Sequence, residues 1–411
     1  MRRHVVNALK LIVAGLLVWF VLGKVEWTDR ITTKERRGPE HKLVEVGSVP
    51  GLILGDWKQE EVRFRPEGRE DEVIVRPGEV DDRVVEVRPG LLTVVKAIEV
   101  GTFLLGALCY FVVASFSSIR WWWLLRVNGI PVGRLQAFRL TWIGIFFNNV
   151  VPGLTGGDVV KAVWVARLAG EKTRPILSVL VDRVLGLLAL GLLAAVVVLF
   201  DFANFREIGT LIFIGFGALA LLTLCFFSKR VRKLIRLKHL LEKLPMSGLL
   251  KKVDQAIYFY RGHMRGIGLW FAASVVNHAL GVIGVTLIGA SLGIDLPLTG
   301  YLVLVPVINI VSAVPIAPAG WGVGEYLYQK LFTDYSIRIA AAQASLMPTL
   351  ALVLSVVYRI HLMLWSLLGS VFLAFEKGRP TEAQVAAALE DPDRPEAPAG
   401  AGSAAAPGGQ G

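Results

Sequence analysis

The sequence predicts an all-α polytopic membrane protein with a small β-rich insertion near its N-terminus. Three features support this fold class: the composition, the length of the apolar runs and the position of the positive charges. Hydrophobic residues make up 54% of the 411 residues, and charged residues only 19%. Because soluble domains carry about 25% charged residues, this composition argues against a soluble enzyme and against a disordered chain.

Six apolar stretches are long enough to span a bilayer core, which needs about 20 residues. They lie at about 5–23, 100–119, 176–200, 207–228, 267–290 and 349–374. The first follows Arg2 and Arg3 and looks like a signal peptide, but no small-x-small cleavage site follows it. We therefore expect residues 1–23 to form an uncleaved first transmembrane helix.

The net charge of +11 is concentrated beside the apolar runs. Residues 120–175 hold eight basic and two acidic residues, and residues 229–265 hold eleven and two. Cytoplasmic loops are enriched in Lys and Arg, so residues 120–134, 161–174 and 229–265 should be cytoplasmic, together with the N-terminus and the C-terminus. Nucleic-acid binding is not expected, because no exposed basic stripe with base-reaching side chains is visible.

This orientation leaves two apolar regions, about 136–169 and 297–348, that are broken by Pro, Gly, Asn and acids. The first must enter the membrane and return to the cytoplasm, and the second must begin and end outside. The charge pattern therefore predicts two re-entrant broken-helix regions that enter from opposite sides. Such a pair is typical of an inverted repeat.

Residues 24–96 form the predicted insertion. The runs 60–65, 72–76 and 83–88 alternate apolar and polar residues and are separated by turn residues, which predicts a small β-meander or barrel outside the cytoplasm. Both a stabilising cap without chemistry and a partner-binding module fit this pattern.

The predicted transmembrane domain, residues 97–375, contains a basic loop and is followed by a tail. The basic loop 229–265 has leucines at roughly helical spacing, so it is either an amphipathic helix on anionic lipid or a plain cytoplasmic loop. The tail 376–411 is rich in Ala, Pro and Gly, which predicts a disordered cytoplasmic segment.

Each broken region contains a Pro/Gly-rich motif that ends in an acid. Irregular backbone at membrane depth has to line protein or water, glycine lets a ligand approach the backbone, and a helix start offers free N–H groups to an anion. We therefore expect a substrate site where the two breaks meet. Its candidate residues are Asn149, Pro152, Gly156, Gly157, Asp158, Pro318, Gly320, Trp321, Gly322 and Glu325.

Arg183 and Arg359 lie inside predicted spans. A charge at the bilayer centre costs about 2.5–3.5 kcal/mol on insertion scales and usually marks function, although snorkelling is the alternative. We expect both arginines to bind a lipid phosphate. Asp158 and Glu325 either complement a helix dipole or bind a cationic head group or a coupling proton. Secondary intramembrane candidates are Asn277, His278 and His361.

Motifs for nucleotide binding, zinc hydrolysis or an activated serine are not visible in the sequence. The Gly23-Lys24 pair lacks the glycine spacing of a phosphate-binding loop, and Cys109 and Cys225 lie inside apolar segments. We therefore expect no enzymatic activity, no cofactor and no metal.

The motifs together resemble the lysylphosphatidylglycerol synthase transmembrane, or flippase-like, family, which includes the membrane half of the bacterial multiple peptide resistance factor. The resemblance covers about 97–375. It rests on Asn149, Pro152, Gly156-Gly157-Asp158 with Lys161, Asp182-Arg183, and Pro315, Pro318-Ala319-Gly320-Trp321-Gly322 with Glu325. It implies an inner-membrane protein that moves a lipid between leaflets; its best-known members translocate aminoacylated phosphatidylglycerol, and others are linked to polyprenyl-linked sugars.

Three departures from the family pattern stand out. The chain carries no aminoacyl-transferase half, has the 24–96 insertion, and has Ala319 and Trp321 where many relatives have a Gly-Gly pair. The first departure speaks against lipid aminoacylation.

We therefore expect a protein of the bacterial cytoplasmic membrane that translocates a phospholipid or other lipid-linked anionic substrate between leaflets. Its expected partners are membrane lipids, chiefly anionic phospholipid; a protein bound to 24–96 and a homo-oligomer remain open. One alternative is a membrane-embedded enzyme that modifies lipid head groups. The six histidines are scattered along the sequence, which argues against clustered catalytic residues. Another is a non-transporting membrane scaffold.

Overall fold

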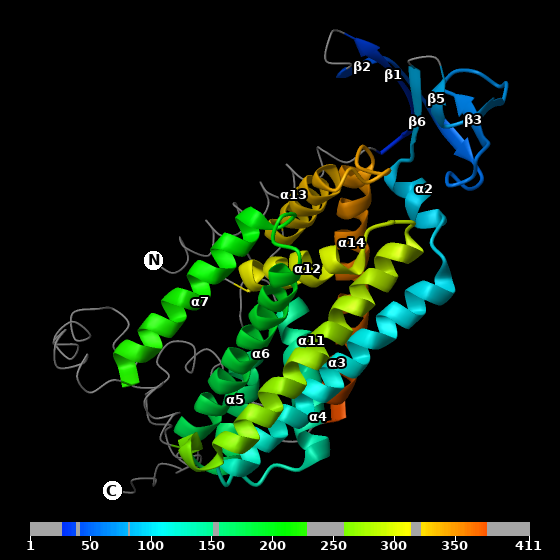
Figure 1. The fold of residues 1–411 in the computed structure, drawn as a ribbon. Coiled ribbons are helices and arrows are strands. Elements are labelled where there is room, and N and C mark those ends of the chain that lie inside the picture. Colours follow the sequence, from blue (N-terminus) through cyan, green and yellow to red (C-terminus); the bar gives the residue numbers. More distant parts are fainter. Residues whose placement is uncertain are drawn as a thin grey trace, which may run out of the picture.

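The computed structural model describes residues 27–37, 42–80, 83–150, 156–227, 259–313 and 322–375. It shows a bundle of helices that carries a small β-sheet at one end (Figure 1). The predicted segments 1–23 and 376–411, and most of the basic loop 229–265, lie outside the described residues.

Four described helices are long and apolar enough to cross a membrane. They are α3 (Val100–Val127), α6 (Thr173–Phe200), α11 (Met264–Ser291, preceded by the 3-10 turn Arg261–His263) and α14 (Met347–Phe375). These four contain the predicted spans 100–119, 176–200, 267–290 and 349–374. The predicted span 207–228 falls on a further helix, α7 (Arg206–Phe227). That α7 and residues 5–23 also cross the membrane stays a prediction.

The first broken region forms a helical hairpin of α4 (Arg134–Val150) and α5 (Gly156–Ala169). The two helices pack closely because glycines meet at their contact: a Cβ added to Gly157 would overlap the backbone carbonyl of Gly144. The hairpin is held to the bundle by α4, which packs against α14.

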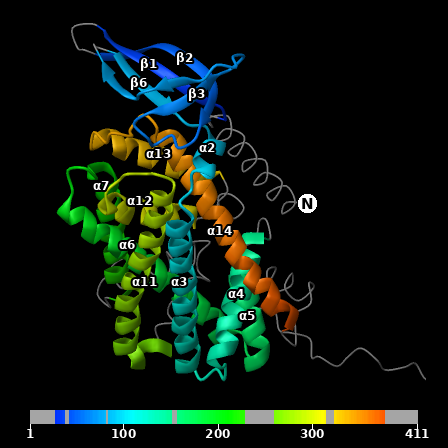
Figure 2. The same ribbon diagram turned by 90° about the vertical axis from the view of Figure 1, so that its right-hand side faces the viewer.

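The second broken region forms a hairpin of α12 (Leu298–Ser312) and α13 (Val323–Arg338). Gly300, near the start of α12, lies against the ring of Tyr335, near the end of α13, so the two helices run in opposite directions. Here α12 packs against α6. The two hairpins lie at opposite ends of the bundle, with α13 beside the sheet and α4 and α5 at the far end (Figure 2). This arrangement agrees with entry from opposite sides; the inverted repeat itself stays a prediction.

The predicted β-rich insertion is confirmed as a six-stranded antiparallel sheet in the order β4-β3-β2-β1-β6-β5. The predicted runs 60–65, 72–76 and 83–88 correspond to three of its strands. The strands are β1 (Asp29–Arg37), β2 (Lys42–Leu54), β3 (Val62–Pro66), β4 (Val73–Val75), β5 (Gly78–Val80) and β6 (Arg83–Arg88). The chain passes from β4 at one edge to β5 at the other, so the topology differs from the simple meander that the sequence predicted.

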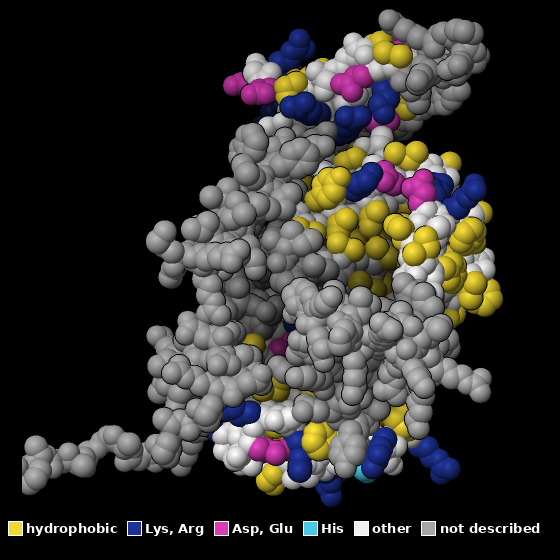
Figure 3. Space-filling view, turned by 90° about the vertical axis from the view of Figure 1, so that its left-hand side faces the viewer, with side chains coloured by type: hydrophobic (Ala, Val, Ile, Leu, Met, Phe, Trp, Pro, Cys, Tyr) yellow, Lys and Arg dark blue, Asp and Glu magenta, His cyan; other side chains and the backbone are white. Residues whose placement is uncertain are grey.

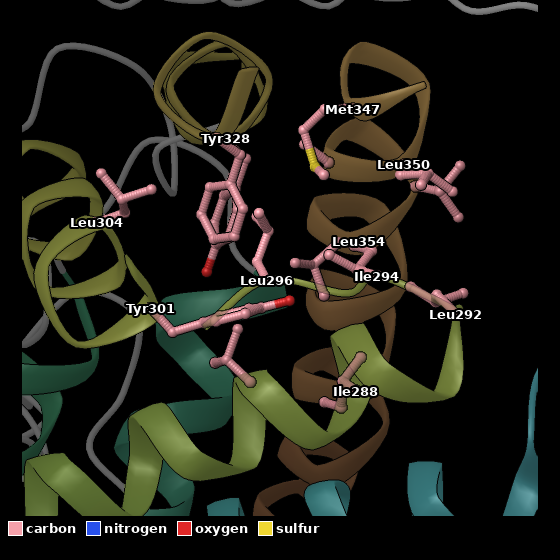
Figure 4. Packing of buried hydrophobic residues seen from close by; sticks show 14 of the residues in the cluster. Ile288, Leu292, Ile294, Leu296, Tyr301, Leu304, Tyr328, Met347, Leu350 and Leu354 are labelled. Carbon is pink, nitrogen blue, oxygen red and sulfur yellow. The ribbon is translucent and has the colours of Figure 1, made fainter. Parts of the chain in front are cut away.

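The sheet and the bundle share one apolar core. Ile53, Trp57 and Phe64 of the sheet region belong to the same buried cluster as Leu292 and Ile294, which lie just after α11. Figure 4 shows the bundle part of this cluster, where side chains from α11, α12, α13 and α14 converge.

A buried carboxylate ties the sheet to the helix that follows it. Asp29, at the start of β1, is 3% exposed. Its carboxylate accepts hydrogen bonds from the backbone N–H groups of Ile53 and Gly90, both at 2.7 Å, and from the Thr93 hydroxyl at 2.9 Å. Thr93 belongs to α2 (Leu91–Lys96), which leads into α3. Every hydrogen bond here has a structural role, so Asp29 fixes how the sheet sits on the bundle.

Candidate functional site

The first helix break is followed by a cluster of charged side chains. Asp158 is the third residue of α5, and its Oδ2 lies 2.5 Å from Nε of Arg183 on α6. Its Oδ1 lies 3.2 Å from Nζ of Lys161, one turn further along α5. The Lys161 ammonium also lies 4.8 Å from the centre of the buried Trp121 ring, within cation–π range. Asp158 therefore binds two cations at the start of a helix whose dipole also favours an anion.

The second helix break is followed by a matching ion pair. Glu325 is the third residue of α13, and its Oε1 lies 2.5 Å from Nε of Arg359 on α14. Its Oε2 accepts a hydrogen bond of 2.6 Å from the N–H of Gly322, which precedes the helix with a φ of 81° in the left-handed region. The Glu325 side chain is 5% exposed and that of Arg359 is 17% exposed. The guanidinium of Arg359 thus points to a buried carboxylate and not to a membrane surface, which disagrees with the snorkelling interpretation.

The two clusters have the same plan. In each, the third residue of a short helix after a break is an acid, and it pairs with an arginine on the next long helix. The sequence identified all four residues as candidates. It did not predict that they pair with each other, because the expected partner of each arginine was a lipid phosphate.

Asn148, and not the predicted site residue Asn149, contacts the start of α5. The side-chain oxygen of Asn148 accepts a hydrogen bond of 2.9 Å from the N–H of Gly157 and so caps the start of α5. Asn149 donates to the backbone carbonyl of Ile145 inside its own helix. The binding role of Asn149 stays a prediction, and its neighbour Asn148 links the end of α4 to the start of α5.

Several predicted site residues cannot be placed. Pro152, Pro318, Gly320 and Trp321 lie outside the described residues. Of the remaining glycines, Gly156 begins α5, Gly157 makes the close contact with α4, and Gly322 precedes α13.

A buried ion pair between Arg120 and Asp182 was not predicted from the sequence. Arg120 is 5% exposed, and its Nε donates to Oδ1 of Asp182 on α6 at 2.7 Å, while Nη1 donates to Ser274 on α11 at 2.8 Å. The predicted span 100–119 ended just before Arg120, because the stretch that begins with this residue is rich in basic residues. The helix instead continues to Val127, and Trp121 is fully buried. The signal that could have identified Arg120 is the apolar sequence on both sides of it.

A cavity of about 180 Å³ lies among α3, α6, α11, α12 and α14. Its polar lining residues are Tyr110, His278, Asn309, Tyr358 and His361. Asn277, the third secondary candidate, donates instead to the Val113 carbonyl of α3. The scattering of the histidines along the sequence is thus misleading for His278 and His361, because the fold brings them to one cavity.

The sequence was then compared with known proteins. Residues 89–369 match the family described as lysylphosphatidylglycerol synthase TM region. The chain belongs to this family. It is also 21% identical over 264 residues to a UPF0104 membrane protein of Pyrococcus horikoshii, an alignment that covers 58% of this chain and 78% of that protein. No solved structure matches.

Membership of the lysylphosphatidylglycerol synthase transmembrane family confirms the resemblance seen in the motifs and agrees with a multi-pass membrane protein. The family region 89–369 contains the three ion pairs and the cavity. It begins just after β6, so the sheet precedes the family region.

Proposed function

We propose that this family member translocates a phospholipid, or another lipid-linked anionic substrate, between the leaflets of a bacterial cytoplasmic membrane. One observation carries the proposal: each of two helical hairpins has an acid–arginine pair after its helix break, and the two hairpins lie at opposite ends of the bundle. Under this proposal the chain is a transporter without catalysis of its own, and both termini are cytoplasmic.

The ion pairs support the proposal because they are costly to place in an apolar bundle. Taking two charges out of water costs several kcal/mol per ion, and their attraction offsets this only with good geometry. A guanidinium binds carboxylate and phosphate with the same charge-assisted hydrogen bonds. An anionic head group that reaches Arg183 or Arg359 would replace Asp158 or Glu325 as its partner. The arginine keeps a partner during this exchange. The released carboxylate also keeps one contact, with Lys161 for Asp158 and with the Gly322 N–H for Glu325, which lowers the cost of moving a charged head group through the membrane.

The outer surface of the helices is apolar and can contact the acyl chains of a lipid. Large apolar side chains are exposed on α3, α11 and α14, among them Leu104, Leu269 and Leu364. On the face shown in Figure 3, hydrophobic side chains gather just below the charged sheet. Acyl chains can stay against this surface while the head group, whose desolvation opposes free crossing, contacts the polar residues inside.

The second ion pair gives a direct test in proteoliposomes that contain a fluorescent phosphatidylglycerol analogue. Glu325→Gln and Arg359→Gln should each slow exchange between leaflets at least about tenfold, since one lost charge-assisted hydrogen bond is worth about 1.5–3 kcal/mol. Arg338→Gln is the matched control, because Arg338 makes a surface pair with Glu207 at 3.7 Å. Unchanged rates in both site variants, at wild-type protein level and stability, would contradict the site.

The same experiment separates translocation from the two alternative functions. Lipids extracted after the assay should have unchanged masses, whereas a mass shift would indicate head-group modification. The observation that favours this alternative is that His278 and His361 line the same cavity. A scaffold would give no exchange above protein-free liposomes.

A further inference from the structure

The cavity among the long helices lies where two glycines bring α3 and α11 together. A Cβ added to Gly106 on α3 would lie 2.7 Å from the carbonyl oxygen of Gly284 on α11, and both glycines line the cavity. Its lining contains no Asp, Glu, Lys or Arg among the described residues. The polar groups around it are imidazoles, phenol hydroxyls and one amide, so the cavity is polar but offers no fixed charge to a ligand.

Four buried polar atoms in and beside this cavity have no hydrogen-bond partner among the described residues. Two of them are the ring Nε2 atoms of His278 and His361, which line the cavity. The other two are the hydroxyls of Ser312, the last residue of α12, and of Tyr328 on α13. The Tyr328 ring centre lies 6.4 Å from that of Tyr358, which lines the cavity. Because nearly all buried polar atoms in native proteins have a partner, these four indicate ordered water.

The cavity has both the volume and the hydrogen-bonding groups that water needs. A volume of about 180 Å³ holds several water molecules, each of which takes about 30 Å³ in the liquid. A buried water makes about two to four hydrogen bonds, whereas a cavity without polar groups stays dry. Asn309, Tyr358 and the two imidazoles supply such groups from three different helices. We therefore expect a small cluster of hydrogen-bonded water in the cavity.

His278 connects the cavity to the buried ion pair between α3 and α6. A Cβ on Gly186 of α6 would lie 3.8 Å from Nε2 of His278 and 3.5 Å from Nη2 of Arg120. Arg120 is in turn the partner of Asp182, at 2.7 Å. Asp182 is next in sequence to Arg183, which belongs to the charged cluster after the first helix break. The polar groups on this side thus lead from the cavity toward the first hairpin.

Tyr358 and Ser312 connect the cavity to the ion pair after the second helix break. Tyr358 lines the cavity and directly precedes Arg359 on α14. A Cβ on Gly324 would lie 3.5 Å from the Ser312 hydroxyl and 3.0 Å from Nη2 of Arg359. The hydroxyl and the guanidinium therefore approach the same point, beside Glu325. Polar groups thus extend from the second hairpin through the cavity toward the first.

His361 can accept and release a proton inside this path. The residue is 2% exposed, and its Nδ1 lies 2.5 Å from the backbone carbonyl of Tyr358. A carbonyl can only accept, so we assign the proton of the neutral ring to Nδ1, which leaves a lone pair on Nε2. The titratable groups around the ring are Tyr110 of α3 at 5.6 Å and Tyr358 at 5.0 Å between ring centres, and His278 on the same lining. The described lining from α6 and α12 adds no charged side chain.

We propose that this cavity is a water-filled proton pathway, in which His361 and His278 relay protons between the two ends of the bundle. In each transfer, Nε2 accepts a proton from one water molecule and returns it to another. Nδ1 of His361 keeps its own proton throughout, so the ring is unchanged afterwards. Histidines and carboxylates inside a membrane domain form proton relays in pumps and transporters. The inference goes beyond the proposed function, because it names the ion whose gradient can drive the protein.

Proton entry into proteoliposomes tests the pathway. Vesicles of phosphatidylethanolamine and phosphatidylglycerol, with the full-length protein and a pH-sensitive dye inside, receive an acid step outside. Potassium and valinomycin hold the membrane potential near zero. The wild type should acidify the lumen faster than protein-free vesicles do, and His361→Phe and His278→Phe should each lose this excess rate. His263→Phe is the matched control, because His263 is exposed in the turn before α11.

A glutamine variant separates a proton relay from a group that only holds water. The amide oxygen of His361→Gln can accept a hydrogen bond from water, but an amide takes up no proton near neutral pH. If His361 relays protons, His361→Gln should lose the excess rate as His361→Phe does. A wild-type rate in His361→Gln would overturn the relay.

A cavity-filling variant checks the location. A Cβ on Gly281, which lines the cavity, would meet only a Val113 methyl at 3.7 Å, so Gly281→Leu can be accommodated. Its side chain displaces water from the cavity and should lower the proton rate. Gly268→Leu is the matched control on the same helix, because nothing lies within 4 Å of its Cβ position. All variants are compared at equal reconstituted amounts and after their unfolding temperatures have been measured.

The outcomes separate this inference from the proposed function, because the proton assay needs no lipid analogue. A wild-type proton rate equal to that of protein-free vesicles overturns the inference even if lipid translocation proceeds. Undiminished proton rates in both His361→Phe and Gly281→Leu overturn it as well. Proton entry that depends on both histidines, in vesicles that show no lipid exchange, supports the inference and overturns the proposed function.

Discussion

Charged residues inside apolar segments can be recognised from this sequence, but the partners with which they pair cannot. Asp158, Arg183, Glu325 and Arg359 could each be selected because each interrupts an apolar run or follows a Pro/Gly break. Their pairing depends on how α5 packs on α6 and α13 on α14, which no local pattern encodes. Arg120 was missed for a related reason: a basic residue beside tryptophans marks a membrane interface only when the helix ends there, and α3 continues beyond it.

The second ion pair predicts a non-additive effect on stability. Glu325→Gln leaves the Arg359 guanidinium without its carboxylate, and removing one partner of a buried pair typically costs about 3–5 kcal/mol. The double variant Glu325→Gln/Arg359→Gln should recover much of that loss, since it removes the uncompensated charge. Thermal unfolding in detergent measures both. The control is Asp334→Asn, which breaks the exposed pair with Lys330 and should change little. A double variant less stable than the single would contradict the assignment.

Asn148 and Asn149 give a second comparison at the residue scale. Asn148→Ala removes the acceptor for the Gly157 N–H, and losing such a helix cap costs about 1 kcal/mol. Asn149→Ala removes a hydrogen bond within one helix and introduces the best helix former, so its net effect should be near zero. The difference in thermal unfolding temperature measures this. A larger decrease in unfolding temperature for Asn149→Ala than for Asn148→Ala would contradict the assignment of the helix cap to Asn148.

At the scale of elements, the sequence predicted correctly the helices that have long apolar runs and the regions in which such runs are broken by proline and glycine. The four long apolar helices and the two broken regions follow from hydropathy, proline and glycine. Strands β1 and β2 were not predicted, because β1 has the sequence DRITTKERR, whose charged residues give no apolar alternation. Its buried members, Asp29 and Thr32, are polar and are buried through tertiary contacts.

The α4–α5 hairpin depends on glycine at its contact. Gly157→Ala would push a methyl group into the backbone carbonyl of Gly144, which only a separation of the helices can relieve. We expect the variant to show a clear loss of monodisperse protein in size-exclusion chromatography. Gly268→Ala, in open surroundings on α11, should behave as wild type or slightly better, because alanine favours helix over glycine. Normal behaviour of Gly157→Ala would mean that the hairpin packs less closely.

At the scale of the whole molecule, the sheet is part of the same core as the bundle and sits at the end where α13 lies. The positive-inside rule assigns this end to the outside and the end with α4 and α5 to the cytoplasm. Neither orientation nor lipid contact follows from packing alone, so the orientation rests on the charge pattern of the sequence.

Cysteine labelling tests this orientation. In a variant without Cys109 and Cys225, single cysteines at Ser48 and Ser247 should react oppositely with an impermeant maleimide in intact cells. Ser48 lies in β2 of the sheet and should react, whereas Ser247 lies in the basic loop 229–265 and should react only after lysis. Equal labelling of both positions would contradict the orientation and with it the re-entrant interpretation.

The most direct test of the proposed function is the rate at which a fluorescent phosphatidylglycerol analogue becomes accessible to an external quencher in proteoliposomes. Wild-type protein should raise this rate well above that of protein-free liposomes. The double variant Arg183→Gln/Arg359→Gln should return it to the protein-free value, because neither arginine remains to bind the phosphate. A wild-type rate equal to that of protein-free liposomes, or a double variant as fast as the wild type, would contradict translocation through the two ion pairs.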